Sequence, residues 1–315
     1  MRHPDIRTQT PWFCEILDLQ PPAGDVYLNP SICRTADGRT LLFVRRVRDS
    51  GIPSANFRGK QYFNDIQMFP ITGDFVVGDR YTLPLPQTYG DENIEDPRAL
   101  AVGNKVWLSC CTFIKNKSHA HQSFFQLDEQ LRVLMRMDPV YGENCSQCLL
   151  NDGHEKNWLY FAHNGDPYMI YHTFPHEVVA MDGQLRPRNV YRTKNIHKDW
   201  KYGQPRGGTP PIFVNGEWWS FFHSSIDIGP KQRQYFVGAY AFSEHAPFTI
   251  TRMTAKPLLK GSDQHPRHQN GHLVVFPGGA TFVDNTWTVV FGVNDVLCGR
   301  IIIPHKDLET CTAKL

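Results

Sequence analysis

A repeated two-strand pattern dominates this sequence of 315 residues. In each copy a polar cluster with Pro or Gly precedes an apolar run, a Gly, Asn or Asp turn, and a second run rich in aromatic or aliphatic residues. The five copies begin 51 to 68 residues apart, at Asn29, Glu95, Glu155, Arg206 and Val274. Such periods are typical of β-propeller blades of about four strands each. The sequence therefore predicts an all-β fold, a five-bladed β-propeller that forms a single domain over residues 1–315.

The predicted blades begin near residues 27, 93, 154, 205 and 272. We expect residues 1–24 to help close the ring by supplying a strand, because closure removes an open sheet edge. Aromatic residues make up 12% of the chain, and the runs rich in Val, Phe, Tyr and Trp favour strands. No stretch of useful length shows the 3.6-residue period of an amphipathic helix.

Charge and hydropathy exclude several classes of protein. The chain has 33 basic and 31 acidic residues, a net charge of +2, which argues against a nucleic-acid-binding surface. No run approaches the roughly 18 apolar residues of a membrane span, and the first residues lack the apolar segment of a signal peptide. We therefore expect a cytoplasmic protein with neither a nucleic-acid partner nor a membrane span.

Metal-ligand spacings are incomplete. Cys145 and Cys148 form a lone CxxC, which could be half a zinc site or a redox pair, but no second CxxC or HxxxH completes it. His119, His121 and the histidines between residues 265 and 272 fit no standard zinc spacing, so we expect them in solvated loops. The sequence predicts no metal and no cofactor.

The polar clusters that open the repeats predict a pocket on the propeller axis, because the first strand of each blade lines the central channel. The clusters hold Asn29; Glu95, Asp96 and Arg98; Lys156 and Asn157; Arg206; and Gly278 and Gly279. The ends of the following strands add Arg45 or Arg46, His172, His223 and Asp295.

Glu95-Asp96-Pro97-Arg98 suggests acid–base chemistry. Neighbouring carboxylates beside an arginine can have different pKa values, and glycosyl transfer needs a protonated carboxyl. The alternative is a turn in which Asp96 caps backbone and Arg98 pairs with a surface acid.

Lys156, Arg206 and His223 could form a cationic patch for phosphate or for a sugar-nucleotide diphosphate. Alternatively each cation pairs with a carboxylate of the ring, Arg206 with Asp227 for example. Gly207 and Gly208 follow Arg206 and predict a close approach of backbone near the axis.

Aromatic residues divide into core and sugar-binding candidates. Trp158, Trp218, Trp219, Phe222 and Phe248 occupy strand positions and are expected in the core. Tyr235 and Tyr240 are the better candidates for substrate contact, since they lie in the hairpin that faces His223.

These motifs resemble the five-bladed propellers of glycoside hydrolase family 130, the β-mannoside phosphorylases and related mannosyltransferases and mannosidases, over roughly residues 27–303. The resemblance rests on Asn29-Pro30 with Arg45, Glu95-Asp96-Pro97-Arg98, Lys156, the Arg206-Gly-Gly-Thr-Pro-Pro run with His223, Tyr235, and the last repeat with Asp295. It implies that Asp96 is the general acid. Substrate binding is expected of Asn29, Arg45, Glu95, Arg98, Asn157, Tyr235, Tyr240 and Asp295, and phosphate binding of Lys156, Arg206, His223 and His172.

One departure concerns the third repeat, where the phosphorylases are expected to have an arginine and this chain has Tyr171 and His172. We expect an inverting enzyme that transfers a β-mannosyl group, as a glycoside phosphorylase or as a transferase dependent on phosphate or a nucleotide sugar. Its partners would be an oligosaccharide, a sugar phosphate or nucleotide sugar, and inorganic phosphate. One alternative is a β-mannoside hydrolase with Glu155 or Glu95 as base. Another is a non-catalytic glycan-binding propeller.

Overall fold

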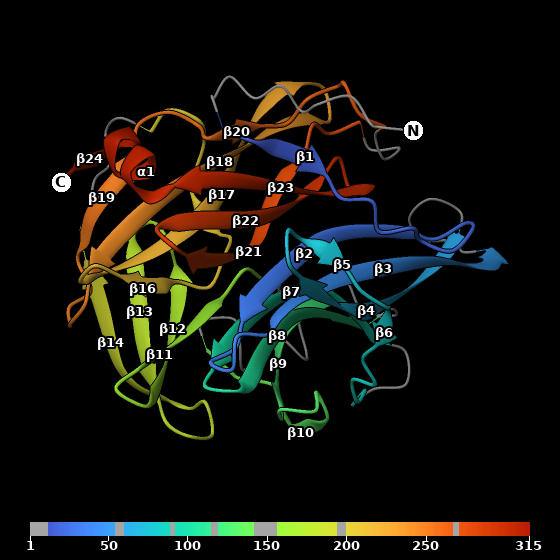
Figure 1. Ribbon diagram of the computed structural model, residues 1–315, viewed down its shortest axis with the longest axis horizontal. Helices are drawn as coiled ribbons and strands as arrows, with labels where there is room; N and C mark the ends of the chain where they lie inside the picture. Colours follow the sequence, from blue (N-terminus) through green and yellow to red (C-terminus); the bar gives the residue numbers. More distant parts are fainter. Residues whose placement is uncertain are drawn as a thin grey trace.

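The computed structural model describes residues 12–53, 60–88, 92–114, 119–141, 156–193, 200–266 and 271–315. These residues form five antiparallel sheets arranged in chain order around one centre (Figure 1). The prediction of an all-β, five-bladed propeller is therefore confirmed. Cys145, Cys148 and Glu155 lie outside the described residues.

The first three blades each follow one repeat. Blade 1 consists of β2 (Val26–Arg34), β3 (Thr40–Pro53), β4 (Lys60–Thr72), β5 (Val76–Val77) and β6 (Tyr81–Thr82). Blade 2 consists of β7 (Glu92–Val102), β8 (Lys105–Ile114), β9 (His119–Leu127) and β10 (Val133–Met137). Blade 3 consists of β11 (Leu159–His163), β12 (Asp166–His172), β13 (His176–Met181) and β14 (Pro187–Thr193).

The last two blades include both ends of the described chain. Blade 4 consists of β15 (Arg206–Gly207), β16 (Ile212–Val214), β17 (Glu217–Gly229), β18 (Gln232–Ser243), β19 (Ile250–Thr254), β20 (Leu259–Lys260) and β24 (Thr312–Lys314). Blade 5 consists of β21 (Val275–Val283), β22 (Thr286–Val293), β23 (Leu297–Pro304) and β1 (Cys14–Ile16). The short helix α1 (His305–Cys311) links β23 to β24. Thus β1 pairs with β23, and β24 pairs with β19, at the outer edges of neighbouring blades.

The core lies between the blades. Within the described residues it divides into five apolar clusters, one for each pair of neighbouring sheets. Between blades 3 and 4, for example, the ring centroids of Phe161 and Trp218 are 4.8 Å apart, and between blades 4 and 5 those of Phe221 and Trp287 are 5.5 Å apart. The tryptophans and phenylalanines that we expected in the core are all buried there.

A bulge near the axis recurs in the innermost strands. In β2 the pairing with β3 shifts between Leu28 and Ser31, and in β7 the pairing with β8 shifts at the equivalent place, between Glu95 and Arg98. The residues in the bulges, Asn29 and Asp96, have φ values of 48° and 51°, which Asn and Asp tolerate better than most side chains. A bulge re-aims a side chain. These two side chains are thereby brought together at the axis.

Glycines let the inner strands approach closely, as we predicted for Gly207 and Gly208. A Cβ atom on Gly207 would lie 2.0 Å from the carbonyl oxygen of Asn157 in blade 3. A Cβ on Gly278 of blade 5 would lie 2.1 Å from the carbonyl oxygen of Pro30 in blade 1. Backbone therefore meets backbone between these neighbouring blades.

We expect Gly278→Ala to destabilise the fold by about 3 kcal/mol, because two strands must separate to admit one methyl group. Gly183→Ala is the matched control, since nothing lies within 4 Å of a Cβ there. Urea unfolding of both variants measures the difference. Equal stability of the two would contradict the close packing at the axis.

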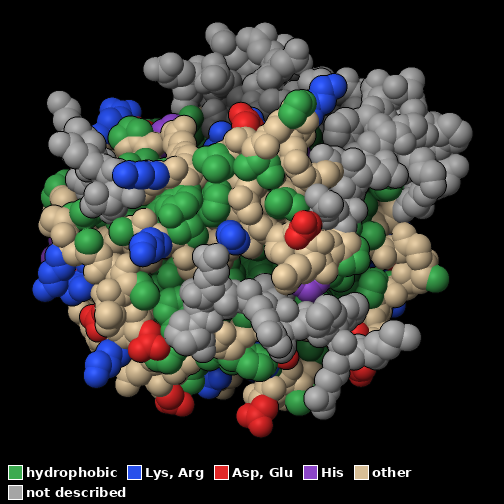
Figure 2. Space-filling model, turned by 90° about the horizontal axis from the view of Figure 1, so that it is seen from above, with side chains coloured by type: hydrophobic (Ala, Val, Ile, Leu, Met, Phe, Trp, Pro, Cys, Tyr) green, Lys and Arg blue, Asp and Glu red, His purple; other side chains and the backbone are tan. Residues whose placement is uncertain are grey.

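Charged groups are dispersed over the surface. On the face shown in Figure 2, the side chains of Lys and Arg and those of Asp and Glu lie in separate small groups, and the basic ones form no continuous stripe. No helix in the described ranges is long and apolar enough to cross a membrane. His121 and His265 are buried, with exposed fractions of 8% and 5%, so the prediction that they are solvated is wrong.

Candidate functional site

A buried carboxyl pair lies where blades 1 and 2 meet at the axis. Oδ1 of Asp96 accepts hydrogen bonds from Nδ2 of Asn29 at 2.7 Å and from Nη1 of Arg45 at 3.0 Å. The other nitrogen of the same guanidinium, Nη2 of Arg45, lies 2.8 Å from Oε1 of Glu95. Nδ2 of Asn64 donates to that oxygen at 3.0 Å. Arg45 therefore binds both carboxyl groups, Asp96 through Nη1 and Glu95 through Nη2.

The two carboxyl groups differ in proton affinity. Burial raises the pKa of Glu95 to about 7; the negative charges of Asp96 and Asp295 act in the same direction, and the positive charges of Arg45 and Lys156 oppose the rise. Burial also raises the pKa of Asp96, but Arg45 and the hydrogen bond from Asn29 outweigh it, so the net pKa lies below the ordinary value. Two neighbouring carboxyl groups with separated pKa values are the arrangement of an acid–base site.

A buried cation lies next to this pair. The side chain of Arg98 is 3% exposed, and its guanidinium lies 4.6 Å from the ring centroid of Phe276 in blade 5. Its Nη2 donates to Oδ1 of Asn157 at 3.4 Å, and its Nε has no partner. No ion pair joins it to a carboxylate in the described part of the chain. The alternative in which Arg98 pairs with a surface acid is therefore wrong.

His223 lies between Arg98 and Arg206. Burial, together with the positive charges of Arg98 and Arg206, lowers its pKa to about 3. Its ring packs against Phe276, with centroids 4.6 Å apart, and the backbone of Arg206 lies opposite it in the sheet. Asp227 pairs with Arg233 at 2.9 Å, not with Arg206. A neutral His223 between two arginines makes this corner of the pocket suitable for an anion.

Three further predicted residues border the same space. Lys156 lowers the pKa of both Glu95 and Asp96, and its Nζ lies 4.4 Å from the ring centroid of Phe113. Asp295 raises the pKa of Glu95 and of Tyr235. The ring of Tyr235 is stacked with that of His223, with centroids 6.2 Å apart. The structure therefore brings together residues from all five blades.

Two predicted site residues do not join this cluster. Tyr240 is fully buried between blades 3 and 4, where it packs against Phe222, Phe242 and His176, so its prediction as a substrate-binding residue is wrong. Tyr235 and Tyr240 lie on one strand with an odd separation and therefore on opposite faces of it. His172 lies against Tyr171, with ring centroids 4.1 Å apart. Among the described residues no contact joins it to Arg98, Arg206 or His223.

Two residues of the site escaped the sequence analysis. Asn64 comes from β4, the third strand of blade 1, and bridges Nε of Arg45 to Oε1 of Glu95. Phe276, the second residue of β21, lies between Arg98 and His223. Phe276 lies two residues before Gly278 in the polar cluster that opens the last repeat, and this position could have identified it as a site residue. No repeat position identifies Asn64.

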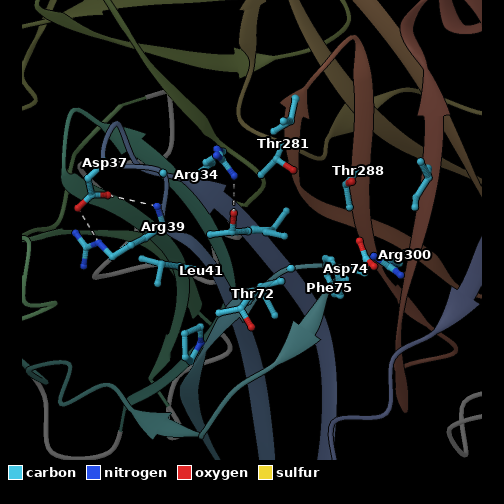
Figure 3. A pocket seen from close by; sticks show the side chains of 18 residues that line it. Arg34, Asp37, Arg39, Leu41, Thr72, Asp74, Phe75, Thr281, Thr288 and Arg300 are labelled. Atoms are coloured by element: carbon cyan, nitrogen blue, oxygen red, sulfur yellow. Dashed lines mark hydrogen bonds and ion pairs between the residues drawn. The ribbon is translucent and has the colours of Figure 1, made fainter.

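A further cavity lies elsewhere. It has a volume of 710 Å³ and lies between blades 1 and 5, at the opposite ends of their inner strands from Asn29 and Gly278 (Figure 3). Among its charged groups, Asp37 pairs with Arg39, and Arg300 pairs with Glu15. Because none of the predicted residues lines it and it holds no buried carboxyl pair, we place the chemistry at the axis.

Two buried histidines predict how stability depends on pH. Burial lowers the pKa of His176 and of His223 to about 3 in the folded protein, whereas the unfolded value is about 6.5. Between these values the unfolded chain binds more protons, so stability falls as pH falls, by about 1.4 kcal/mol per pH unit for each histidine. Glu95, with a raised pKa, gives the opposite slope between about pH 4.5 and 7. Because each histidine is half-protonated in the unfolded chain at pH 6.5, the net expectation is a loss of about 1 kcal/mol from pH 6.5 to 5.5.

Urea unfolding at pH 6.5 and 5.5 measures this slope, and His176→Phe should remove the share of one histidine. His245→Phe is the matched control, since His245 is exposed. An unchanged slope in His176→Phe would show that His176 accepts a proton in the folded state.

Comparisons with known proteins agree with this fold. No protein-family model matches the chain. A 1,2-β-oligomannan phosphorylase from Thermoanaerobacter sp. (strain X514) is 26% identical over 152 residues, which span 46% of this chain and about half, 49%, of that relative.

Solved structures match over nearly the whole length. The β-1,2-mannobiose phosphorylase from Listeria innocua has a TM-score of 0.69 at 15% identity, covering 93% of this chain and 94% of that one. A GDP-Man-dependent mannosyltransferase from Leishmania mexicana has a TM-score of 0.63 at 13% identity, covering 95% and 92%. A third structure comes from the GH130 family of mannoside phosphorylases, which contains glycoside hydrolases that target β-1,2-mannosidic linkages in Candida mannan. It has a TM-score of 0.66 at 13% identity, covering 90% of this chain and 85% of that one. The expected likeness to glycoside hydrolase family 130, as a divergent form of its fold, is confirmed.

Proposed function

We propose that this protein is an inverting β-mannoside phosphorylase, in which phosphate attacks a β-mannosyl group and releases α-mannose 1-phosphate. The observation that carries the proposal is the juxtaposition of a buried carboxyl pair with a buried arginine that lacks a carboxylate partner. The first can supply a proton to a leaving oxygen, and the second can hold an anionic nucleophile.

The carboxyl side of the pocket suits a sugar. Asn29, Arg45 and Asn64 hold one oxygen of each carboxyl group, and no described residue bonds the other oxygen, Oδ2 of Asp96 or Oε2 of Glu95. Two open carboxyl oxygens can receive the hydroxyl groups of a mannosyl unit. Asp295 and Tyr235 would bind the same sugar from blades 5 and 4.

The arginine side suits phosphate. Burying the charge of Arg98 without a carboxylate partner is costly, so a bound anion would recover part of that cost. Arg206 adds a second positive charge, and Lys156 a third near the carboxyl pair. This concentration of cations favours phosphate as the nucleophile over water, which a hydrolase would activate with a second carboxylate such as Glu95.

The comparisons support the same reaction. The relative matched in sequence is named an oligomannan phosphorylase, and the structure from Listeria innocua is a mannobiose phosphorylase. The Leishmania mexicana structure is a mannosyltransferase dependent on GDP-Man, and the pocket's cations could hold a diphosphate equally well. The test must therefore separate the two donors.

Pure protein is incubated with β-1,2- and β-1,4-mannobiose, with and without phosphate, and separately with GDP-mannose or α-mannose 1-phosphate and mannose as acceptor. We expect α-mannose 1-phosphate from a mannobiose only when phosphate is present, and mannobiose from α-mannose 1-phosphate in reverse. Release of mannose without phosphate would assign a hydrolase. Transfer only from GDP-mannose would assign a transferase, and binding without turnover of any donor would assign a glycan-binding propeller.

A further inference from the structure

Two histidines from blades 3 and 4 meet at the end of the ring away from the carboxyl pair. His163 is the last residue of β11, the inner strand of blade 3 that begins just after Asn157 at the axis. His245 lies two residues after the end of β18, the strand that carries Tyr235 near its start. Both histidines are therefore at the ends of strands that lead away from the pocket.

The two imidazoles face each other at the spacing of metal ligands. Nε2 of His163 lies 3.4 Å from Nδ1 of His245. This separation is long for a hydrogen bond, since an N–H donor usually lies about 2.7–3.2 Å from its acceptor. Two nitrogens that are each about 2.1 Å from one tetrahedral zinc ion, however, lie about 3.4 Å apart. The nitrogens therefore have the separation of two ligands of one ion.

Glu244 favours the tautomer that such a site needs. To present the lone pair of Nδ1 to a metal, His245 must carry its proton on Nε2. Oε2 of Glu244 lies 3.7 Å from that nitrogen. A carboxylate behind a ligating histidine fixes its tautomer and makes it a stronger ligand. Glu244 also adds a negative charge next to the position of the ion.

Packing holds the pair in place. The ring of His163 lies against Trp218 and Phe248, with centroids 6.0 and 6.1 Å away. Nε1 of Trp218 donates to the carbonyl oxygen of Glu244 at 3.3 Å, and the backbone N–H of Phe248 donates to that of His245 at 3.0 Å. The same aromatic residues thus fix one imidazole and the turn that carries the other, which favours binding because little order has to be gained.

The remaining coordination positions belong to Asn164 and water. Within the described part of the chain, no group of three or more His, Cys, Asp or Glu could hold a metal ion, so this is a site of two imidazoles. Nδ2 of Asn164 lies 3.2 Å from Nε2 of His163. A half-turn of the amide exchanges its nitrogen and oxygen, and would place an oxygen ligand there.

We propose that His163 and His245 bind one zinc ion between blades 3 and 4. Imidazole nitrogen is a preferred ligand of zinc, and water can complete the shell. The two histidines are 82 residues apart in sequence, so the ion would join the hairpin of one blade to a turn of the next. Its role would be to stabilise the contact between the blades, independently of any reaction at the axis.

The test is a titration with zinc chloride of protein that has been freed of metal with EDTA. We expect His245→Ala to bind one zinc ion fewer than the wild type in isothermal titration calorimetry. Zinc should raise the melting temperature of the wild type, because an ion that binds the folded state stabilises it, and this rise should shrink in His245→Ala. Glu244→Gln should weaken binding by about tenfold. His172→Ala, which removes an exposed histidine from the same blade as His163, is the matched control and should bind zinc as the wild type does.

The comparison of variants is needed because the CxxC of Cys145 and Cys148 could also bind zinc. Equal zinc binding by the wild type and His245→Ala would overturn the inference, as would saturation only at millimolar zinc. His163→Phe keeps an aromatic ring against Trp218 and should lose the same ion. If only His245→Ala loses it, a single surface histidine binds the metal and the two-histidine site is wrong.

Discussion

Asp96→Asn should lower phosphorolysis of β-mannobiose by about 10²- to 10⁴-fold, the range expected when an acid–base site is disabled. Two effects combine in this variant. The first is the loss of an anionic acceptor that Asn29 and Arg45 hold in position, since the amide must turn its NH₂ group toward the sugar. The second is indirect: the negative charge of Asp96 contributes to the raised pKa of Glu95, so removal of that charge lowers the pKa of Glu95.

The second effect gives this prediction a signature that a misfolded variant would lack. In the wild type, kcat/KM should decline as pH rises through about 7, where Glu95 loses its proton. In Asp96→Asn the decline should begin at a lower pH, and part of the lost rate should return in acid. Phosphate titrates equally in both assays, so a difference in pH dependence between the two profiles must come from a group of the enzyme. Asp37→Asn, on the hairpin at the far end of β2, is the matched control and should behave as the wild type does. A turnover within about threefold of wild type in Asp96→Asn would remove Asp96 from the site.

The repeat pattern predicted the fold because each copy marks one blade. The pairs Asn29-Pro30 and Asp96-Pro97 also carry the local geometry of the site. Proline cannot donate a ladder hydrogen bond and is tolerated at bulges, and Asn or Asp before it accepts a positive φ. The same dipeptide type thus occupies the two equivalent bulges that bring Asn29 and Asp96 into contact.

Other parts of the site depend on packing that the repeats do not encode. Asn64 enters from the third strand of its blade, and Arg98 crosses the axis to Phe276, so both contacts require the closed ring. The raised pKa of Glu95 depends on burial, which the sequence Glu95-Asp96 does not reveal. Tyr240 was predictable from alternation, since it lies an odd number of residues from Tyr235 on the same strand.

Arg98→Met should separate phosphate binding from both folding and sugar binding. Burial lowers the pKa of Arg98 to about 10, from an ordinary 12.5, which corresponds to a cost of about 3 kcal/mol for holding its charge in the folded protein. A methionine can fill the same space against Phe276 without that charge. We therefore expect a melting temperature equal to or above that of the wild type. Loss of the charged hydrogen bonds to phosphate should lower kcat/KM for phosphate by about 10²-fold, whereas mannobiose binding measured without phosphate should change little.

The matched control is Arg252→Met, because Arg252 is an arginine with a largely covered side chain that lies on β19 and pairs with Glu217 at 2.9 Å. Removing Arg252 leaves Glu217 without its partner, so that variant should lose stability and keep its kinetics for phosphate. The two arginines thus predict opposite behaviour: one costs stability and serves the reaction, and the other stabilises a blade. Unchanged phosphate kinetics in Arg98→Met would contradict the anion site, and a lower melting temperature would show that its charge is compensated in the folded protein.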